Sequence, residues 1–463
     1  MGTVRLDSST RKESGPRVKP RIHLLIACGL IACGFFTGPN NSKAAIPVSE
    51  LAKALAENNL DAVRAAVAKG REALGNKAGE PEVPDVFRPV PAEAKLMSRD
   101  EAQRGFTPHF VTLEKMRWWK AGIDPTTLTA PLRGPASVIT GNVAAARARL
   151  DGAEQSLAMA KDAAEFLIWA QEQAGSGVYP FPAARGTSKA RAMEVATRFI
   201  ANADKTGKLE TVVRNGWAFD DAGDGGLQFD NGECGVAMLD LYEMTKDHRY
   251  LESVRKSADW AAGRPMCPNW NYNSFSVFLL ARMFAVTQEP KYLDAAIIKA
   301  RLGVVPGQLT NGPRAGRWID PHNARPAYHY IMMRALTQLV AVMPPEHVER
   351  PEIVCALSLG LKTRNAEMVA RGMMNKEHAM ESLLLVNRTF KNDAAFLRDT
   401  HSSAALEAIG RLVSDEARRA KQPLAPGAWG LFLEFIASGT PPAPCFWRLH
   451  APLLARPPGG IAR

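Results

Sequence analysis

Cysteine is scarce in this sequence and never occurs in a metal-binding spacing. The 463 residues include six Cys, with no CxxC and no Cys/His pair at the spacing of a zinc site. This excludes a structural zinc module and a small fold held by disulfide bonds. Hydrophobic residues make up 46% and charged residues 23%, so a disordered chain and a collagen-like repeat are excluded as well.

Concentrated basic charge is also lacking. The chain has 58 Lys and Arg against 47 Asp and Glu, a net charge of +11, and six of the basic residues lie within the first 21 positions. We find no basic stripe and no nucleic-acid-binding motif, so nucleic acid is not a predicted partner. The mild excess favours long-range attraction of an acidic polymer.

The apolar run at 22–36 is too short to span a bilayer comfortably, and it follows a basic segment. This is the layout of a secretory signal. Leu30-Ile31-Ala32-Cys33 resembles a lipobox, which predicts a lipid anchor on Cys33, whereas Ser42-Lys43-Ala44 resembles an ordinary cleavage site. An uncleaved single-pass anchor is the third reading. All three predict an exported protein, which is periplasmic, a cell-surface lipoprotein or secreted.

Four regions follow from composition. We assign 1–44 to the signal and a short spacer, 45–149 to a helical arm with a Pro-rich linker, 150–438 to the main domain and 439–463 to a disordered tail. Within the arm, 46–74 reads as a short helix pair and 107–142 as loop-rich. The main domain is helical throughout, with Gly residues at helix ends and no convincing strand pattern.

An internal repeat is the most informative feature of the main domain. Five residues recur 42 positions later with the same or a similar side chain: Asn231, Leu241, Thr245, Tyr250 and Leu251 answer to Asn273, Met283, Thr287, Tyr292 and Leu293. A period near 40 with two helices per unit predicts stacked helical hairpins.

The two helices of a unit differ in kind. The helix at 273–287 is apolar nearly all round, whereas 290–302 has a one-sided apolar stripe. Buried inner helices and amphipathic outer helices predict an all-α fold, an α/α toroid of about six hairpins. An open solenoid is the alternative, and the long loop before every second helix favours closure.

Those long loops lead into the inner helices and should gather at one mouth of the toroid. They are 214–233, 264–274 and 311–330, and they combine aromatic rings with amides, carboxylates and arginines. Aromatic faces beside hydrogen-bonding groups suit sugar rings, although tryptophans between hairpins also pack as core. The candidate substrate-binding residues are Trp217, Trp270, Asn271, Tyr272, Asn273 and Trp318.

A family resemblance rests on two segments. Gly177-Val178-Tyr179-Pro180-Phe181-Pro182 and Gly226-Leu227-Gln228-Phe229-Asp230-Asn231, with the helix that follows, resemble the α/α-toroid carbohydrate-active enzymes. Among these the chain is most similar to the pectate lyases of that fold, although its loop reads Phe-Asp-Asn where theirs has a Phe-Asn-Asp-like order. The resemblance covers about 150–345. It implies an arginine base, with Arg325 as the candidate, and calcium, with Asp230 as a candidate ligand.

The residues themselves support two reactions. β-Elimination on a uronate polymer needs a base and a group that holds the carboxylate. We expect Asn323 to cap the helix that follows it, which places Arg325, Tyr328 and His329 in its first turns. Tyr328 or His329 would then be the base, and Arg325 with Asn273 would hold the carboxylate. Either aromatic residue can instead be an ordinary packing residue.

Glycoside hydrolysis needs two facing carboxylates instead. Its candidates are the acidic residues of the mouth loops: Asp220, Asp221, Asp224, Asp230, Glu233 and Asp320. The run from Asp220 to Asp224 also reads as a solvated turn or a calcium loop. The sequence therefore predicts an exported enzyme on an acidic polysaccharide, with a lyase placed ahead of a hydrolase. A surface lipoprotein that binds glycan without catalysis is the third class.

Cys234 and Cys267 are the pair with the best prospect of a disulfide, since both lie near the same end of neighbouring hairpins. Two buried free thiols are the alternative.

Overall fold

The structure is a computed structural model, and it describes residues 48–82, 84–105, 133–149, 151–174, 177–179, 205, 226–372, 377–419 and 426–438. The chain divides into Met1–Phe35 and Phe36–Arg463, and every described residue belongs to the second unit. Within these ranges the chain is helical, with one isolated bridge between Gln308 and Trp318 and no named strand. The predicted signal, residues 214–225 of the first predicted mouth loop and the predicted C-terminal tail lie outside them.

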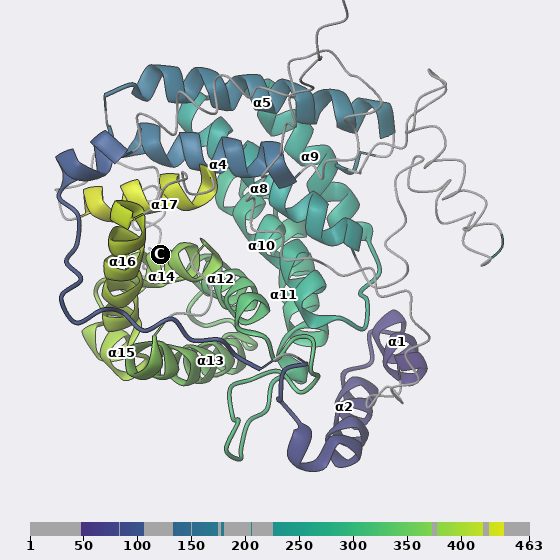
Figure 1. Ribbon diagram of the computed structural model, residues 1–463. Helices are drawn as coiled ribbons and strands as arrows, with labels where there is room; N and C mark the ends of the chain where they lie inside the picture. Colours follow the sequence, from purple (N-terminus) through teal and green to yellow (C-terminus); the bar gives the residue numbers. More distant parts are fainter. Residues whose placement is uncertain are drawn as a thin grey trace, which may run out of the picture. The chain divides into compact units, whose positions relative to one another are not determined.

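Six helices form an inner ring. Each packs against the next one in the chain, and the last packs back against the first, so the ring is closed (Figure 1). The six are α4 (Arg133–Arg147), α8 (Gly226–Thr245), α10 (Trp270–Thr287), α12 (Pro326–Val342), α14 (Glu377–Thr389) and α17 (Pro426–Ser438). Closure confirms the predicted α/α toroid over the open solenoid.

An outer layer covers this ring. Its main helices each pack against the inner helix that precedes them. They are α5 (Ala153–Ala174), α9 (His248–Gly263), α11 (Pro290–Gly303), α13 (Arg350–Arg371) and α16 (Ser402–Arg419), with the short α15 (Ala394–Asp399) before α16. In two of the hairpins the connection from the inner to the outer helix is short, at 246–247 and 288–289. The connections that lead back to the next inner helix are longer, at 264–269 and 304–325. The long connections therefore lie at one end of the ring, as predicted.

Burial explains why the two layers differ in sequence. In α10 the first fourteen residues are all buried, because the helix is surrounded by α8, α11 and α12. In α9 the buried residues include Tyr250, Val254 and Ala258, spaced by four along one face, and Asp247 caps the helix by accepting a hydrogen bond from the backbone N–H of Arg249.

The repeat corresponds to repeated hydrogen bonds. The side-chain amide of Asn231 donates to the carbonyl of Ser257 in α9, and that of Asn273 donates to the carbonyl of Gly303 at the end of α11. Each Oδ1 also accepts a backbone N–H from a preceding loop. The recurring asparagine therefore ties its inner helix to an outer helix and to an earlier segment of the chain, which is residues 177–179 for Asn231 and the mouth loop 264–274 for Asn273.

The arm is an integral part of the domain. It begins with α1 (Val48–Ala56), α2 (Leu60–Leu74) and the 3-10 turn η1 (Gly75–Lys77). Residues 79–101, named here the rim strap, then run past α13 and α16 toward α4 (Figure 1). The ring itself begins at α4, so it starts inside the segment that the sequence assigns to the arm, and 133–142 is helical where we expected loop.

Cys234 and Cys267 are both buried and form no disulfide bond, so the second of the two sequence readings describes them. No helix within the described ranges is long and apolar enough to cross a membrane.

Candidate functional site

Two of the three mouth loops meet through a ladder of side-chain amides. Asn323 accepts hydrogen bonds on Oδ1 from the backbone N–H of Asn271 at 3.0 Å and from its side-chain amide at 2.8 Å. Asn323 in turn donates to Asp320 at 2.9 Å and to Asn269 at 3.2 Å. The loops 264–274 and 311–330 therefore converge as predicted. Asn323 does not cap α12, because its side chain is held within this ladder.

The first mouth loop is described only from Gly226 onward, within α8. Gln228 there accepts a hydrogen bond from the hydroxyl of Ser276 in α10 at 2.7 Å and donates to the carbonyl of Pro265 at 3.5 Å. The end of this loop therefore lies beside the second loop. Trp217 and the acidic run Asp220–Asp224 lie outside the described residues.

The tryptophans of the second and third loops are buried, which differs from the expected exposed sugar-binding faces. The indole N–H of Trp318 donates to the carbonyl of Val304 at 2.9 Å, and the ring of Trp270 lies against Gly307, where it leaves no room for a Cβ. Both rings fill space between hairpins. In this structure neither presents a face to a ligand.

Aromatic surface at the mouth comes from other residues. The ring of Phe229 stacks with Tyr272 at 6.3 Å and contacts Phe275 at 4.2 Å between centroids. Phe229 is half-buried, and Tyr272 keeps slightly more exposure than the tryptophans. Of the predicted binding residues, Asn271 donates to the side chains of Asn269 and Asn323, Asn273 donates to backbone carbonyls, and Tyr272 is buried with 8% exposure.

His329 is buried and cannot meet a substrate as a base. Its Nε2 lies 3.0 Å from the carbonyl oxygen of Gly360, and its ring packs edge-on against Trp318 at 5.4 Å. Burial, with a smaller contribution from the positive charge of Arg364, holds the pKa of His329 well below its ordinary value. The packing interpretation of His329 is therefore correct.

Arg325 and Tyr328 form a cluster with His322 at the start of α12. The guanidinium of Arg325 lies 4.3 Å from the centre of the Tyr328 ring and donates to Nδ1 of His322 at 2.8 Å. The His322 ring stacks on Tyr328 at 4.5 Å. Burial and the adjacent Arg325 lower the pKa of His322 to about 4. The cluster therefore carries a single positive charge, with Arg325 and His322 half-buried and Tyr328 buried.

The strongest electrostatic feature lies on the inner face of the ring, and of its three residues only Glu233 was a candidate from the sequence. Arg334 of α12 donates from one nitrogen to Glu233 of α8 and from the other to Glu381 of α14. Its guanidinium also lies over the ring of Phe278 at 4.7 Å. The Arg334 side chain is 3% exposed, whereas the Glu233 and Glu381 side chains keep 22% and 19%. Two partly accessible carboxylates thus face each other across one buried cation.

The environment of Glu381 favours its protonated form. Burial raises its pKa, and the negative charges of Glu233 and Asp240 act in the same direction, against the attraction of Arg334.

A second charged layer, deeper along α8 and shared with α4 and α10, has two carboxylates and two guanidinium groups. Arg282 donates to Asp240 at 2.9 Å and to Glu243 at 2.8 Å, and Arg147 lies 3.3 and 3.5 Å from the same two carboxylates. Burial alone would raise the pKa of Asp240, but the two guanidinium groups outweigh it and lower that pKa. The side chains of Asp240 and Glu243 are 10% and 14% exposed, which is less than the exposed fractions of Glu233 and Glu381. This layer is better suited to holding helices together.

Asp230 is the fifth residue of α8 and is half-buried. Asp320 is in the amide ladder, where burial raises its pKa. The described part of the chain contains no group of three or more His, Cys, Asp or Glu side chains that could hold a metal ion. Calcium remains a prediction from the sequence.

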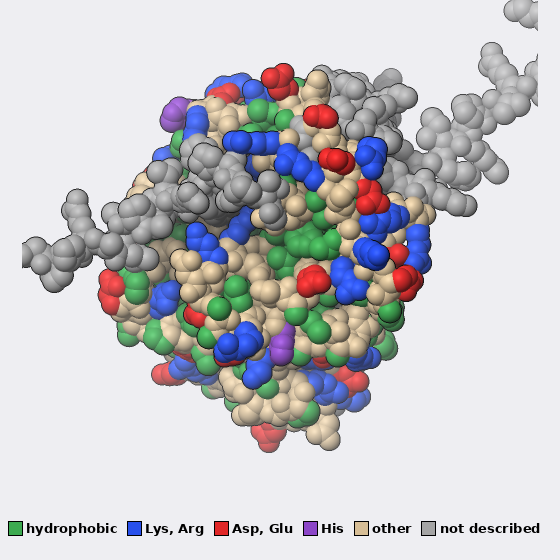
Figure 2. Space-filling view, turned by 90° about the vertical axis from the view of Figure 1, so that its left-hand side faces the viewer, with side chains coloured by type: hydrophobic (Ala, Val, Ile, Leu, Met, Phe, Trp, Pro, Cys, Tyr) green, Lys and Arg blue, Asp and Glu red, His purple; other side chains and the backbone are tan. Residues whose placement is uncertain are grey.

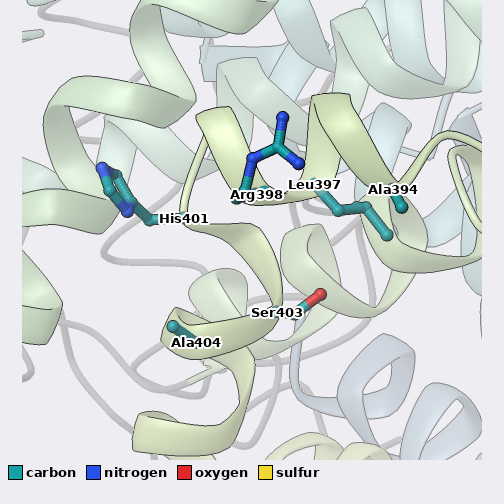
Figure 3. A pocket seen from close by; sticks show the side chains of 6 residues that line it. All are labelled: Ala394, Leu397, Arg398, His401, Ser403 and Ala404. Carbon is teal, nitrogen blue, oxygen red and sulfur yellow. The ribbon is translucent and has the colours of Figure 1, made fainter.

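Away from the ring axis, a shallow hollow of about 380 Å³ lies at the surface between α15 and α16. Figure 3 shows its six lining residues, which include Arg398, His401 and Ser403 but no carboxylate. On the face drawn in Figure 2 the Lys and Arg side chains are interspersed with Asp and Glu. That face therefore has no continuous basic patch among the residues described.

No protein-family model and no curated protein matches the chain. Among solved structures, a polysaccharide lyase is 14% identical with a TM-score of 0.44, and the match covers 74% of this chain and 97% of that one. A family 88 glycosyl hydrolase from Bacteroides vulgatus is 13% identical with a TM-score of 0.43, covering 74% and 99%. A family 76 glycoside hydrolase from a bovine Bacteroides thetaiotaomicron strain is 11% identical with a TM-score of 0.39, covering 84% and 77%.

Proposed function

We propose that the protein is an exported enzyme that cleaves an acidic polysaccharide, and that glycosidic hydrolysis is the reaction its geometry supports best. One observation carries the choice of reaction. Glu233 and Glu381 project from two different inner helices onto the same guanidinium and keep partial exposure. Two carboxyl groups in unlike protonation states are what hydrolysis of a glycosidic bond requires.

The raised pKa of Glu381 suggests a role for each glutamate. Glu381, whose pKa is raised, would hold the proton and give it to the leaving sugar oxygen. Glu233 would be the ionised partner that activates water or attacks the sugar carbon. Arg334 would fix both carboxylates in orientation, since a guanidinium donates in a planar fork.

Residues at the mouth of the ring support an acidic polysaccharide as the substrate. The half-buried Phe229 ring, stacked on the buried Tyr272, offers apolar area near the amide ladder of the second and third loops, a combination that suits sugar rings. Arg325 forms no ion pair with any acidic side chain of the described ranges. Its positive charge at the helix start would therefore be available for a sugar carboxylate. Export, and a lipid anchor at Cys33, rest on the N-terminal sequence.

β-Elimination is the second candidate, and Arg325 with Tyr328 carries it. Their contact places a phenol hydroxyl and a guanidinium on one turn of α12. The lyase reading is weaker than it was from the sequence alone, because His329 and Asn273 are buried in structural hydrogen bonds.

The test is incubation of the purified protein with a panel of polyuronates, followed by two readouts. New reducing ends without ultraviolet absorbance would support hydrolysis, and absorbance of an unsaturated sugar would support elimination. Retained binding with neither product would favour the non-catalytic glycan-binding alternative and contradict the proposal.

A further inference from the structure

The rim strap forms backbone hydrogen bonds with the third mouth loop. The N–H of Gly79 donates to the carbonyl of Ile319 at 2.8 Å, and the N–H of Glu82 donates to the carbonyl of Pro321 at 3.2 Å. These two carbonyls flank Asp320 of the amide ladder. The strap therefore supports the back of the segment whose other side forms the mouth.

A cluster of four charged groups then joins the strap, the loop and α13. The carboxylate of Asp85 lies 3.1 Å from Arg364 of α13 and 3.8 Å from Arg317 of the loop. Glu367 pairs with the same two arginines. The Arg364 side chain is fully buried and also donates to the carbonyl of Ala324, the residue before Arg325. Asp85 is thus connected through one guanidinium to the backbone just before α12.

The strap is also packed closely on both sides of Asp85. The guanidinium of Arg371 lies 3.7 Å from the centre of the Phe87 ring. Gly372 has a positive φ of 102°, and a Cβ there would overlap the carbonyl of Arg88. Further along, the N–H of Met97 donates to the hydroxyl of Ser414 in α16 at 3.0 Å. The contacts of Asp85 are therefore set by a strap that is held at several points.

We propose that Asp85 is a positioning residue for the third mouth loop, and that the rim strap is a structural part of the candidate site. Asp85 neutralises Arg317 and Arg364 together, and so holds the loop at 304–325 and the start of α12 in register with α13. The part of this inference that concerns catalysis rests on the proposed function. The part that concerns the order of the loop does not.

The test uses the full-length protein with Asp85→Asn, which removes the charge at nearly constant shape. We expect hydrogen exchange at 304–325 to rise at least about tenfold, because two buried guanidinium groups then share one carboxylate. Hydrogen exchange in peptides from α8 and α10 should change little. Glu352→Gln is the matched control, since Glu352 joins the arm to α13 through the exposed partner Arg64, and it should leave 304–325 unchanged.

Unchanged exchange at 304–325 in a folded Asp85→Asn protein would overturn the proposal, and so would a uniform rise across all peptides. If Asp85→Asn does not fold, Arg317→Gln removes the loop side of the same cluster and should loosen 304–325 alone. In the polyuronate assay Asp85→Asn should raise KM more than it lowers kcat. A fall in kcat at constant KM would mean loss of folded protein and would contradict a positioning role. Lack of turnover by the wild-type protein would count against the proposed function, with the exchange result still deciding the role of Asp85.

Discussion

Gly430 of α17 lies directly against the backbone of Gly141 in α4, and this contact closes the ring. A Cβ built at Gly430 would overlap the carbonyl oxygen and the Cα of Gly141. Two glycines at one crossing let the backbones approach more closely than side chains would allow. The first and last inner helices are therefore held together at a point where neither carries a side chain.

Replacing Gly430 by Ala should destabilise the protein by about 1–3 kcal/mol, because the added methyl group forces the two helices apart. Denaturant unfolding measures this. Gly263→Ala is the matched control, since a Cβ at Gly263 meets nothing within 4 Å. Equal stability of the two variants would contradict a ring closed by this contact.

The repeat made the fold predictable. Asn231 and Asn273 recur because each holds a loop and an outer helix, so a period near 40 carries direct information about hairpins. The location of the mouth followed from the alternation of short and long connections. These features are local in sequence or periodic, and both properties can be read without coordinates.

Other expectations were wrong for reasons of tertiary packing. Helix α4 contains Gly134, Pro135 and Gly141 and looks like loop, yet it is an inner helix because α5, α8 and α17 surround it. Trp270 and Trp318 look like binding residues in polar loops, yet their rings fill gaps between hairpins. Composition alone does not distinguish a tryptophan that fills the core from one that presents its ring to a ligand.

The sequence named Glu233 as a candidate, but its partners Glu381 and Arg334 were missed for a related reason. Glu381 and Arg334 lie inside helices and not in the loops that drew attention, and their partners are over 40 residues away in sequence. One signal was present. Arg334 is the only charged residue of the strongly apolar helix α12 other than a histidine, and a lone buried charge on an inner helix indicates a partner across the ring.

The deeper charged layer should influence the pKa of Glu381, the proposed general acid. Asp240 raises the pKa of Glu381 by repulsion, so Asp240→Asn should lower that pKa. A general acid works only while protonated, and the basic limb of the pH–rate profile should therefore move to lower pH in the variant. Initial rates on a polyuronate across pH 4 to 9 measure this, roughly the range in which most proteins stay folded. Movement of the limb to higher pH would contradict the assignment of Glu381 as the acid.

His322 should make the fold sensitive to acid. Its pKa in the folded protein is about 4, below the ordinary value of 6.5. The unfolded chain therefore binds more protons between these two values, and stability should fall as the pH is lowered from 6.5 toward 4. His322→Gln should reduce that fall by at most about 3 kcal/mol. Urea unfolding of both proteins at pH 7 and pH 4.5 is the measurement, and identical pH dependence would contradict the shifted pKa.

Arg325 distinguishes substrate binding from lyase chemistry. If it holds a sugar carboxylate, Arg325→Ala should raise KM by about tenfold or more on a charged substrate, since a charge-assisted hydrogen bond is lost. Tyr328→Phe should then have a small effect. If the two residues perform elimination, both variants should instead lose kcat by at least about 100-fold. Steady-state kinetics on a polyuronate and on a neutral glycan separate the two outcomes.

The central claim is that Glu233 and Glu381 act as the catalytic pair, and turnover by Glu381→Gln and Glu233→Gln tests it most directly. Glu289→Gln is the control, since Glu289 pairs with Arg255 at the protein surface. On a polyuronate that the wild-type protein cleaves, each of the first two variants should lose at least about 100-fold in kcat, with the thermal midpoint of the folded protein still measurable and Glu289→Gln fully active. Wild-type rates in folded Glu381→Gln and Glu233→Gln would contradict the account.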